Sequence, residues 1–305
     1  MQPQPSVEIS SGFIALVGPP NVGKSTLLNQ LLGQKISIVS PKPQTTRNRI
    51  LGVYNQPECQ LIFLDTPGLH QAKNRLNSEM VKIARNTISE VDVVAYMIDA
   101  GAPTAENRGE RLRETAALLE QSGRPAVLIC NKIDRLSKEK LLPLIDTWQQ
   151  VYPFTAIVPI SALTGEGVET LVSELRRLMP RGPRLFPQEH PTNLGVRFIC
   201  GEIVREKIML LTRDELPYST AVTVEHFQEE PRLTTIHATI MVEKDSQKGI
   251  IIGRRGEMLK NIGRAARKEI EEMLESRVVL KLWVKVEKNW TGSPRVLKEL
   301  GIEEG

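Results

Sequence analysis

The segment Gly18–Ser25, with the sequence GPPNVGKS, constrains this chain more than any other feature. It matches the pattern G-x-x-x-x-G-K-[ST], follows the apolar run Phe13–Val17, and leads into Thr26–Leu32, whose apolar residues have helical spacing. Glycines let backbone N–H groups approach phosphate oxygens, and the start of a helix adds partial positive charge. The segment therefore predicts a phosphate-binding loop, with Lys24 reaching the β- and γ-phosphates and the Ser25 hydroxyl binding Mg²⁺.

Strand-like apolar runs alternate with amphipathic helical patterns from Phe13 to Met179, which predicts an α/β domain with helices on both faces of a sheet. The second and third strands are too close in sequence for a crossover helix, so we expect a hairpin and one antiparallel edge in a mixed, mainly parallel sheet. The predicted strands are 13–18, 50–55, 60–64, 92–99, 125–130 and 155–160, and the predicted helices are 24–33, 75–89, 106–122, 137–150 and 167–179.

Three further motifs follow predicted strands, where such sheets bind their ligands. In Asp65-Thr66-Pro67-Gly68, the carboxylate can hold a water on Mg²⁺ and the Gly68 N–H can reach a γ-phosphate. In Asn131-Lys132-Ile133-Asp134, the Asp134 carboxylate can accept hydrogen bonds from N1–H and the 2-amino group of guanine. Backbone N–H groups of Ser161-Ala162-Leu163 can contact the guanine carbonyl. Together the motifs predict a GTP site and disfavour an ATPase or kinase.

The spacing of these motifs resembles that of the translation-factor-like GTPases. The resemblance implies that Pro43–Arg47 is a first switch, in which Thr45 or Thr46 completes the Mg²⁺ shell, and the family pattern favours Thr46. Position 69, where many small GTPases carry a water-orienting glutamine, is Leu69. Asn21 matches the residue that binds K⁺ in potassium-stimulated GTPases, so we expect Mg²⁺ as cofactor and leave K⁺ open as a second one.

The predicted site has four groups of residues. The catalytic group is Lys24, Thr46, Gly68 and Asn21. The Mg²⁺ ligands are Ser25, Thr46 and Asp65. The nucleotide-binding residues are Gly18, Pro19, Pro20, Asn21, Val22, Gly23, Lys24, Ser25, Thr26, Asp65, Thr66, Pro67, Gly68, Asn131, Lys132, Asp134, Ser161, Ala162 and Leu163. The RNA-binding residues are Ile250, Ile251, Gly253, Arg254, Arg255, Gly256 and Lys260, for the reasons given next.

A proline-rich segment at 181–191 is typical of a linker between two domains. The pattern after it predicts a helix near 192–211, strands at 221–229 and 233–244, a long helix ending near Glu275 and a strand at 278–286. Between Lys248 and Lys268 lie seven basic residues and one acidic residue. The segment Gly253-Arg254-Arg255-Gly256, after an isoleucine run, resembles the Gly-x-x-Gly loop of a type II KH domain, an α+β fold. Its glycines permit close approach to a sugar-phosphate backbone, its arginines meet phosphate charge, and the isoleucines can floor a groove for bases.

The predicted organisation is a disordered tail at 1–10, a P-loop GTPase (G) domain at 11–180, the linker at 181–191 and a KH RNA-binding domain with its C-terminal tail at 192–305. A GTPase domain followed by a KH domain resembles the Era family of ribosome-assembly GTPases. The resemblance implies a GTP-hydrolysing switch that binds the 3′ end of 16S rRNA and the 30S subunit and has a peripheral link to the membrane. The alternatives are a GTPase whose second domain binds protein, and an RNA-binding module with a vestigial nucleotide site.

Composition bounds the remaining possibilities. The chain has 305 residues, a formal net charge of +4, three cysteines and four histidines, with no metal-ligand spacing among the last two types. No apolar run approaches the length of a membrane span, and the N-terminus lacks the pattern of an export signal. We therefore expect a cytoplasmic, monomeric protein with reduced thiols and no zinc site.

Overall fold

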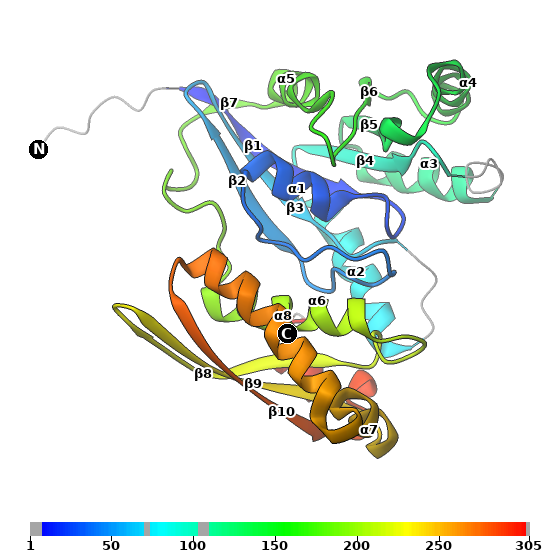
Figure 1. Cartoon of the computed structure of the whole chain (residues 1–305). Helices are drawn as coiled ribbons and strands as arrows, with labels where there is room; N and C mark the ends of the chain where they lie inside the picture. The colour runs from blue at the N-terminus through cyan, green and yellow to red at the C-terminus, as the bar shows by residue number, and fades with distance from the viewer. Residues whose placement is uncertain (1–7, 70–73, 103–109, 303–305) are drawn as a thin grey trace, which may run out of the picture. The chain divides into compact units, whose positions relative to one another are not determined.

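The computed structural model describes residues 8–69, 74–102 and 110–302 (Figure 1). They form two compact units. The first holds the described residues of Met1–Gln34, Asn48–His70 and Val81–Asn193, and the second holds those of Lys35–Arg47, Gln71–Met80 and Leu194–Gly305. Two segments from the N-terminal half, around the predicted first switch and before Val81, thus belong to the second unit. Most of the predicted tail, and residues 106–109 of a predicted helix, lie outside the described residues.

The first unit is built on a mixed sheet whose strand order is β2-β3-β1-β4-β5-β6, with β7 beside β1. The β2–β3 and β1–β7 pairs are antiparallel and the other pairs are parallel, so the predicted hairpin edge is confirmed. The strands are β1 (Ile9–Val17), β2 (Ile50–Gln56), β3 (Cys59–Asp65), β4 (Val93–Asp99), β5 (Ala126–Asn131), β6 (Ala156–Pro159) and β7 (Arg181–Gly182). β1 begins before the predicted Phe13, because the polar residues Ser10 and Ser11 also pair with β3.

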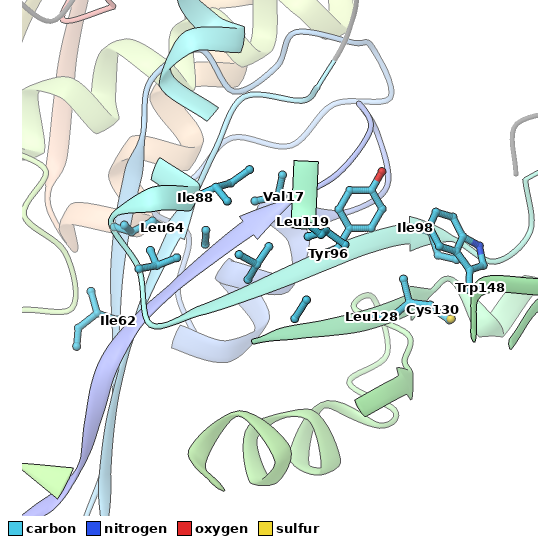
Figure 2. Packing of buried hydrophobic residues seen from close by; sticks show 14 of the residues in the cluster. Val17, Ile62, Leu64, Ile88, Tyr96, Ile98, Leu119, Leu128, Cys130 and Trp148 are labelled. Carbon is cyan, nitrogen blue, oxygen red and sulfur yellow. The ribbon is translucent and has the colours of Figure 1, made fainter. Parts of the chain in front are cut away.

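Helices surround this sheet, and a core of apolar side chains fixes three of them to it. Figure 2 shows alternate residues of neighbouring strands on one side of the sheet, such as Tyr96 and Ile98, packed with Leu119 and Trp148. This spacing arises because every second side chain of a strand points to the same face. The helices are α1 (Lys24–Leu32), α2 (Arg75–Ser89), α3 (Glu110–Ser122), η1 (Ile133–Arg135), α4 (Lys138–Gln149) and α5 (Val168–Leu178).

The second unit packs helices on one face of a sheet with strand order β10-β9-β8, in which β8 is antiparallel and β10 parallel to β9. Its core joins α6, α7 and α8 to the sheet. The elements are α6 (Val196–Leu211), β8 (Ala221–Glu230), β9 (Leu233–Val242), α7 (Asp245–Ile252), η2 (Arg254–Gly256), α8 (Glu257–Leu274), β10 (Arg277–Val286), η3 (Trp290–Gly292) and α9 (Pro294–Glu299).

β9 ends earlier than the sequence-based expectation, which extended this strand to Lys244. The strand ends at Val242, and the Gln247 side chain accepts hydrogen bonds from the backbone N–H groups of Glu243 and Lys244, at 2.9 and 3.1 Å. These bonds satisfy donors that begin a helix, so the isoleucine run becomes its last turn. In the part of the chain that is described, no helix meets the length and hydropathy of a bilayer span, and all three cysteines are buried and free.

Candidate functional site: a phosphate loop and a basic glycine loop

Two glycines of Gly18–Ser25 occupy backbone positions that admit no side chain. Gly18 has a φ of 147°, and a Cβ there would lie 2.2 Å from the carbonyl oxygen of Met97. Gly23 has a φ of 107°, and a Cβ there would lie 2.2 Å from Nδ2 of Asn131. Both the left-handed backbone and the close neighbours exclude larger residues. The loop is therefore held between β1, β4 and β5, with α1 starting at Lys24.

Lys24 is buried within this loop, with 6% of its surface exposed. Its Nζ donates hydrogen bonds to the carbonyl oxygens of Gly18 and Pro19, at 3.1 and 3.0 Å. Burial lowers the pKa of Lys24 from 10.5 to about 8, although the nearby Asp65 charge opposes the change. Burial removes the water that would stabilise the Lys24 cation. A bound phosphate would stabilise this cation in its place, because it brings a negative charge close to the ammonium group.

The two predicted Mg²⁺ ligands of the first unit lie together. The Ser25 hydroxyl donates a hydrogen bond of 2.6 Å to Oδ2 of Asp65, which is fully buried at the end of β3. The next residue, Thr66, is held in place because its hydroxyl donates a hydrogen bond to the carbonyl of Leu16, at 2.8 Å. A hydroxyl and a carboxylate are hard oxygen donors of the kind Mg²⁺ prefers. The donor set therefore fits a magnesium ion.

The segment Gly68–Leu69, which follows β3, contacts the phosphate loop through its backbone. The N–H of Leu69 donates to the carbonyl of Gly18, at 3.1 Å. A Cβ on Gly68 would lie 2.9 Å from Cα of Pro20, so glycine is required for this approach. Leu69 itself packs against the apolar core of the first unit. Its side chain therefore contributes packing and carries no group that could orient a water molecule.

Asn131 joins two of the predicted nucleotide-binding segments. Its Nδ2 donates to the carbonyl of Val22, at 2.6 Å, and its Oδ1 accepts from the N–H of Ala162, at 2.8 Å. Both Asn131 and Ser161 are buried, whereas 69% of Leu163 is exposed. One amide thus sets the distance between the phosphate loop and the loop predicted to contact guanine, as expected for a supporting residue.

Lys132 and Asp134 follow on the same loop. Lys132 adopts a left-handed backbone conformation with a φ of 68°, and its Nζ donates to the carbonyl of Asn21, at 2.7 Å, and to Oδ2 of Asp99, at 2.6 Å. Asp134 lies in η1, with 24% of its side chain exposed and Nε of Arg135 at 3.8 Å. The predicted site did not include Asp99. Its position at the end of β4 could have identified it from the sequence, because the other predicted motifs also lie at strand ends.

Asn21 and Thr46 complete the predicted catalytic group, and the roles of all four of its residues stay predictions. Asn21 is exposed, with a φ of 62°. Thr46 is buried in Lys35–Arg47, a segment of the second unit. Its neighbour Thr45 donates from its hydroxyl to the carbonyl of Lys42, at 2.7 Å. That bond engages the Thr45 hydroxyl within a turn of its own segment.

The second unit presents the predicted RNA-binding loop between α7 and α8. Gly253 has a φ of 72°, and a Cβ there would lie 2.7 Å from Cβ of Met258, whereas Gly256, with a φ of 80°, has open space around it. Arg254 and Arg255 between them are exposed, as is Lys260 in the first turns of α8. The loop therefore offers cations and unobstructed backbone to a polyanion.

The structure corrects one residue of this prediction. Ile250 is 53% exposed, but Ile251 is fully buried in the core of the second unit. Consecutive residues of a helix point about 100° apart, so α7 can present only part of the isoleucine run to a ligand. In this structure Ile251 therefore anchors α7 in the core, and its side chain is not exposed to a ligand.

Comparisons with known proteins agree with both halves of this arrangement. Residues 13–132 match a family model described as 50S ribosome-binding GTPase, and residues 215–291 match the KH domain. The chain is 52% identical to the GTPase Era of Geotalea uraniireducens over 97% of its own length and 99% of that protein, and 46% identical to that of Lacticaseibacillus paracasei over 96% and 97%.

Two solved structures superpose on nearly the whole chain. A variant of Aquifex aeolicus Era bound to GDP and AlF4⁻ has a TM-score of 0.92 and 42% identity, covering 97% of this chain and all of that one. Era in complex with MgGDPNP and nucleotides 1506–1542 of 16S ribosomal RNA has the same TM-score and coverage, with 43% identity. The fold predicted from the sequence, a P-loop GTPase domain followed by a KH domain, is confirmed.

Proposed function

This chain belongs to the Era family of GTPases, and from that premise we propose that its KH domain binds the 3′ end of 16S rRNA and that GTP hydrolysis controls this binding during assembly of the 30S subunit. The observation that carries the proposal is the likeness to the Era structure that holds both MgGDPNP and 16S rRNA nucleotides. The exposed Gly253–Gly256 loop supports it, because it combines open backbone with two arginines.

In this proposal each predicted site residue has its own role in hydrolysis. Lys24 neutralises charge on the β- and γ-phosphates, the Gly68 N–H donates to the γ-phosphate, and Asp134 selects guanine. Ser25, Asp65 and Thr46 would hold the magnesium ion, which would supply positive charge at the transferred phosphoryl group. Loss of the γ-phosphate releases the segments around Thr46 and Gly68, and in this proposal their release lowers RNA affinity.

Water activation needs a group other than residue 69, because Leu69 neither donates nor accepts a hydrogen bond from its side chain. Asn21 supplies a candidate: its side chain binds a potassium ion beside the phosphates in this proposal. Turnover is then faster in KCl than in NaCl, and Asn21→Ala removes the difference. Equal rates of the unchanged protein in the two salts would sink the potassium part alone.

The decisive experiment measures GTP hydrolysis with and without a single-stranded RNA that copies the 3′ end of 16S rRNA. RNA binding together with a changed rate supports the proposal. The absence of both RNA binding and a rate change would contradict it. The double variant Arg254→Glu with Arg255→Glu distinguishes this proposal from the main alternative, a GTPase whose second domain binds protein. RNA affinity should fall in the variant under the proposal and stay unchanged under the alternative. A cytoplasmic location, with a peripheral link to the membrane, completes the proposal and is checked by cell fractionation.

A further inference from the structure

A row of three rings lies on the face of the KH sheet opposite α6, α7 and α8; the end of that face at Ala221 and Met241 packs against Trp290 and Leu297. His226 on β8, His237 on β9 and Trp283 on β10 lie side by side, with ring centroids 4.8 Å apart for the first pair and 5.2 Å for the second. Figure 1 shows α6 and α8 against the opposite face of this sheet, in line with the core contacts. None of the three rings belongs to the Gly253–Gly256 loop.

The sequence builds this row through strand alternation and one irregularity. On β10, Leu280, Leu282 and Val284 face the helices, so Lys281 and Trp283 point to the other side. On β8 the register shifts between Val224 and His226, and this β-bulge places His226 opposite His237. A bulge re-aims the following side chains. Without it, the ring would not continue the row.

The row is accessible and has basic neighbours. Trp283 is 48% exposed, and Arg277 and Lys281, on the same face of β10, are exposed and form no ion pair among those identified in the described residues. Lys285 lies on the same face but already pairs with Glu287, at 2.8 Å. Partial desolvation lowers the pKa of His237, and the charges of Lys281 and His226 lower it further, which favours a neutral ring at pH 7.

We propose that this ring row is a stacking surface for unstacked bases of single-stranded RNA, with Lys281 and Arg277 meeting the phosphates. The inference rests on the proposed function, since it adds a second contact region to the RNA-binding unit. Flat rings accept any base on their faces, and open sheet faces bear such rings in other RNA-binding folds. A lipid surface fits less well, because lipid binding scales with apolar area and β10 exposes only Trp283 and Val279 as large apolar side chains.

The position of β10 lets one RNA strand reach both regions. β10 is the edge strand of the sheet, and α7, which ends at Gly253, packs against it. In this proposal an RNA strand held at the Gly253–Gly256 loop turns around this edge and lays its next bases on Trp283. A KH loop clamps about four nucleotides, so the ring row is expected to engage nucleotides beyond those four.

Tryptophan fluorescence tests the contact directly. The chain has three tryptophans, and Trp148 and Trp290 are buried, with 3% and 0% exposed. RNA of about 12 nucleotides, within the range that single-strand grooves accommodate, is expected to quench the emission of Trp283. The Trp283→Phe protein should lose this quenching. Binding without any quenching in the unchanged protein would overturn the inference, as would quenching by anionic phospholipid vesicles but not by RNA.

Affinity separates the ring row from the loop. Trp283→Ala should weaken binding of the RNA of about 12 nucleotides roughly tenfold and leave binding of about 4 nucleotides unchanged. Trp283→Phe should retain most of the affinity, because it keeps a ring. Leu210→Ala is the matched control, since Leu210 on α6 has the same 48% exposure. If the unchanged protein binds RNA and Trp283→Ala binds it equally well, the ring row is refuted while the proposed function stands; if the unchanged protein binds no RNA, both fail.

Discussion

The chain carries two glycine loops for phosphates, and they are built in opposite ways. In the first unit, Gly18 and Gly23 leave no room for a Cβ, and the cation, Lys24, is buried. In the second unit, Gly256 has open space and the cations Arg254 and Arg255 are exposed. A buried, fully bonded loop can fix a phosphate to within fractions of an ångström, as catalysis requires. An exposed loop can bind and release a polymer, at an affinity that depends on salt.

The largest expected effect is at Gly23. In Gly23→Ala the new Cβ meets Nδ2 of Asn131 at 2.2 Å, so the amide that ties Val22 to Ala162 must move. GTP hydrolysis should fall by about a hundredfold or more, because catalysis is lost with misplacement of about 1 Å. A steady-state phosphate-release assay checks this.

Gly33→Ala is the matched control for that variant. Gly33 ends α1 with a φ of 64°, and a Cβ there would meet nothing within 4 Å. The substitution therefore adds backbone strain of about 1 kcal/mol without a clash, and turnover should stay within about twofold of the unchanged protein. If both variants lose activity alike, close packing around Gly23 is not what the first loop depends on.

Nucleotide choice comes next in size. Asp134→Asn replaces two carboxylate acceptors by one acceptor and a donor that faces the donor groups of guanine, and GTP affinity should fall by about fiftyfold. Xanthosine triphosphate, which has a carbonyl where guanine has its amine, should bind this variant better than GTP does. Arg135→Ala serves as the control, because Arg135 is exposed and lies 3.8 Å from Asp134. A nucleotide titration in which Asp134→Asn still prefers GTP would remove Asp134 from the base site.

The second loop should tolerate change better, and unequally. Gly253→Ala places a Cβ 2.7 Å from Cβ of Met258, whereas Gly256→Ala meets nothing. We expect RNA affinity to fall about tenfold for the first and by less than about fivefold for the second, since only strain of about 1 kcal/mol applies there. Fluorescence anisotropy with a 16S rRNA 3′-end RNA measures both. Equal losses would mean that open space at Gly256 is filled by the RNA itself.

Sequence reasoning found the first loop more completely than the second for a physical reason. Gly18, Asp65 and Asn131 follow separate strands, but parallel strands bring their ends to one edge, so spacing alone predicts their meeting. Asp99 follows the same rule, yet only its hydrogen bond to Lys132 reveals its part. The role of Ile251 depended on which side of α7 faces the core, and the ring row depended on a bulge at Val224 and His226. Neither leaves a pattern in the sequence.

The inclusion of Lys35–Arg47 in the second unit was also unpredicted, because it depends on long-range bonds: Lys42 and Arg47 donate to backbone carbonyls, and Lys35 pairs with carboxylates. Lys35 donates a hydrogen bond of 2.7 Å to Glu206, which is 2% exposed, and Lys207 donates one of 2.6 Å to the same carboxylate. Glu269 on α8 accepts from both lysines. Unlike its exposed glycine loop, this part of the second unit holds its charges partly buried and paired, as the first loop holds Lys24.

The smallest predicted effect tests that network. Burial raises the pKa of Glu269, but hydrogen bonds from Lys207 and Lys35 outweigh it, so the pKa lies below 4.5 in the folded protein. A lowered carboxyl pKa stabilises the fold above the unfolded value and loses this effect as pH falls through the folded value. Glu269→Gln should therefore lower the free energy of unfolding by about 1 kcal/mol at pH 7, with allowance for partial exposure, and by less below pH 4.5.

Glu272→Gln, on the same helix, is the control for this measurement. Glu272 is 66% exposed and lies 3.9 Å from Lys268, so its pair should contribute nothing measurable. Urea denaturation at several pH values compares the three proteins. If Glu269→Gln and Glu272→Gln follow the same pH profile, the Lys35–Glu206–Lys207–Glu269 network does not hold the segment. If only Glu269→Gln changes the free energy of unfolding, and the change becomes smaller in acid, the buried charge pairs stabilise this part of the second unit. That result would distinguish the network from the loop at Gly253–Gly256, whose arginines are exposed and available to a ligand.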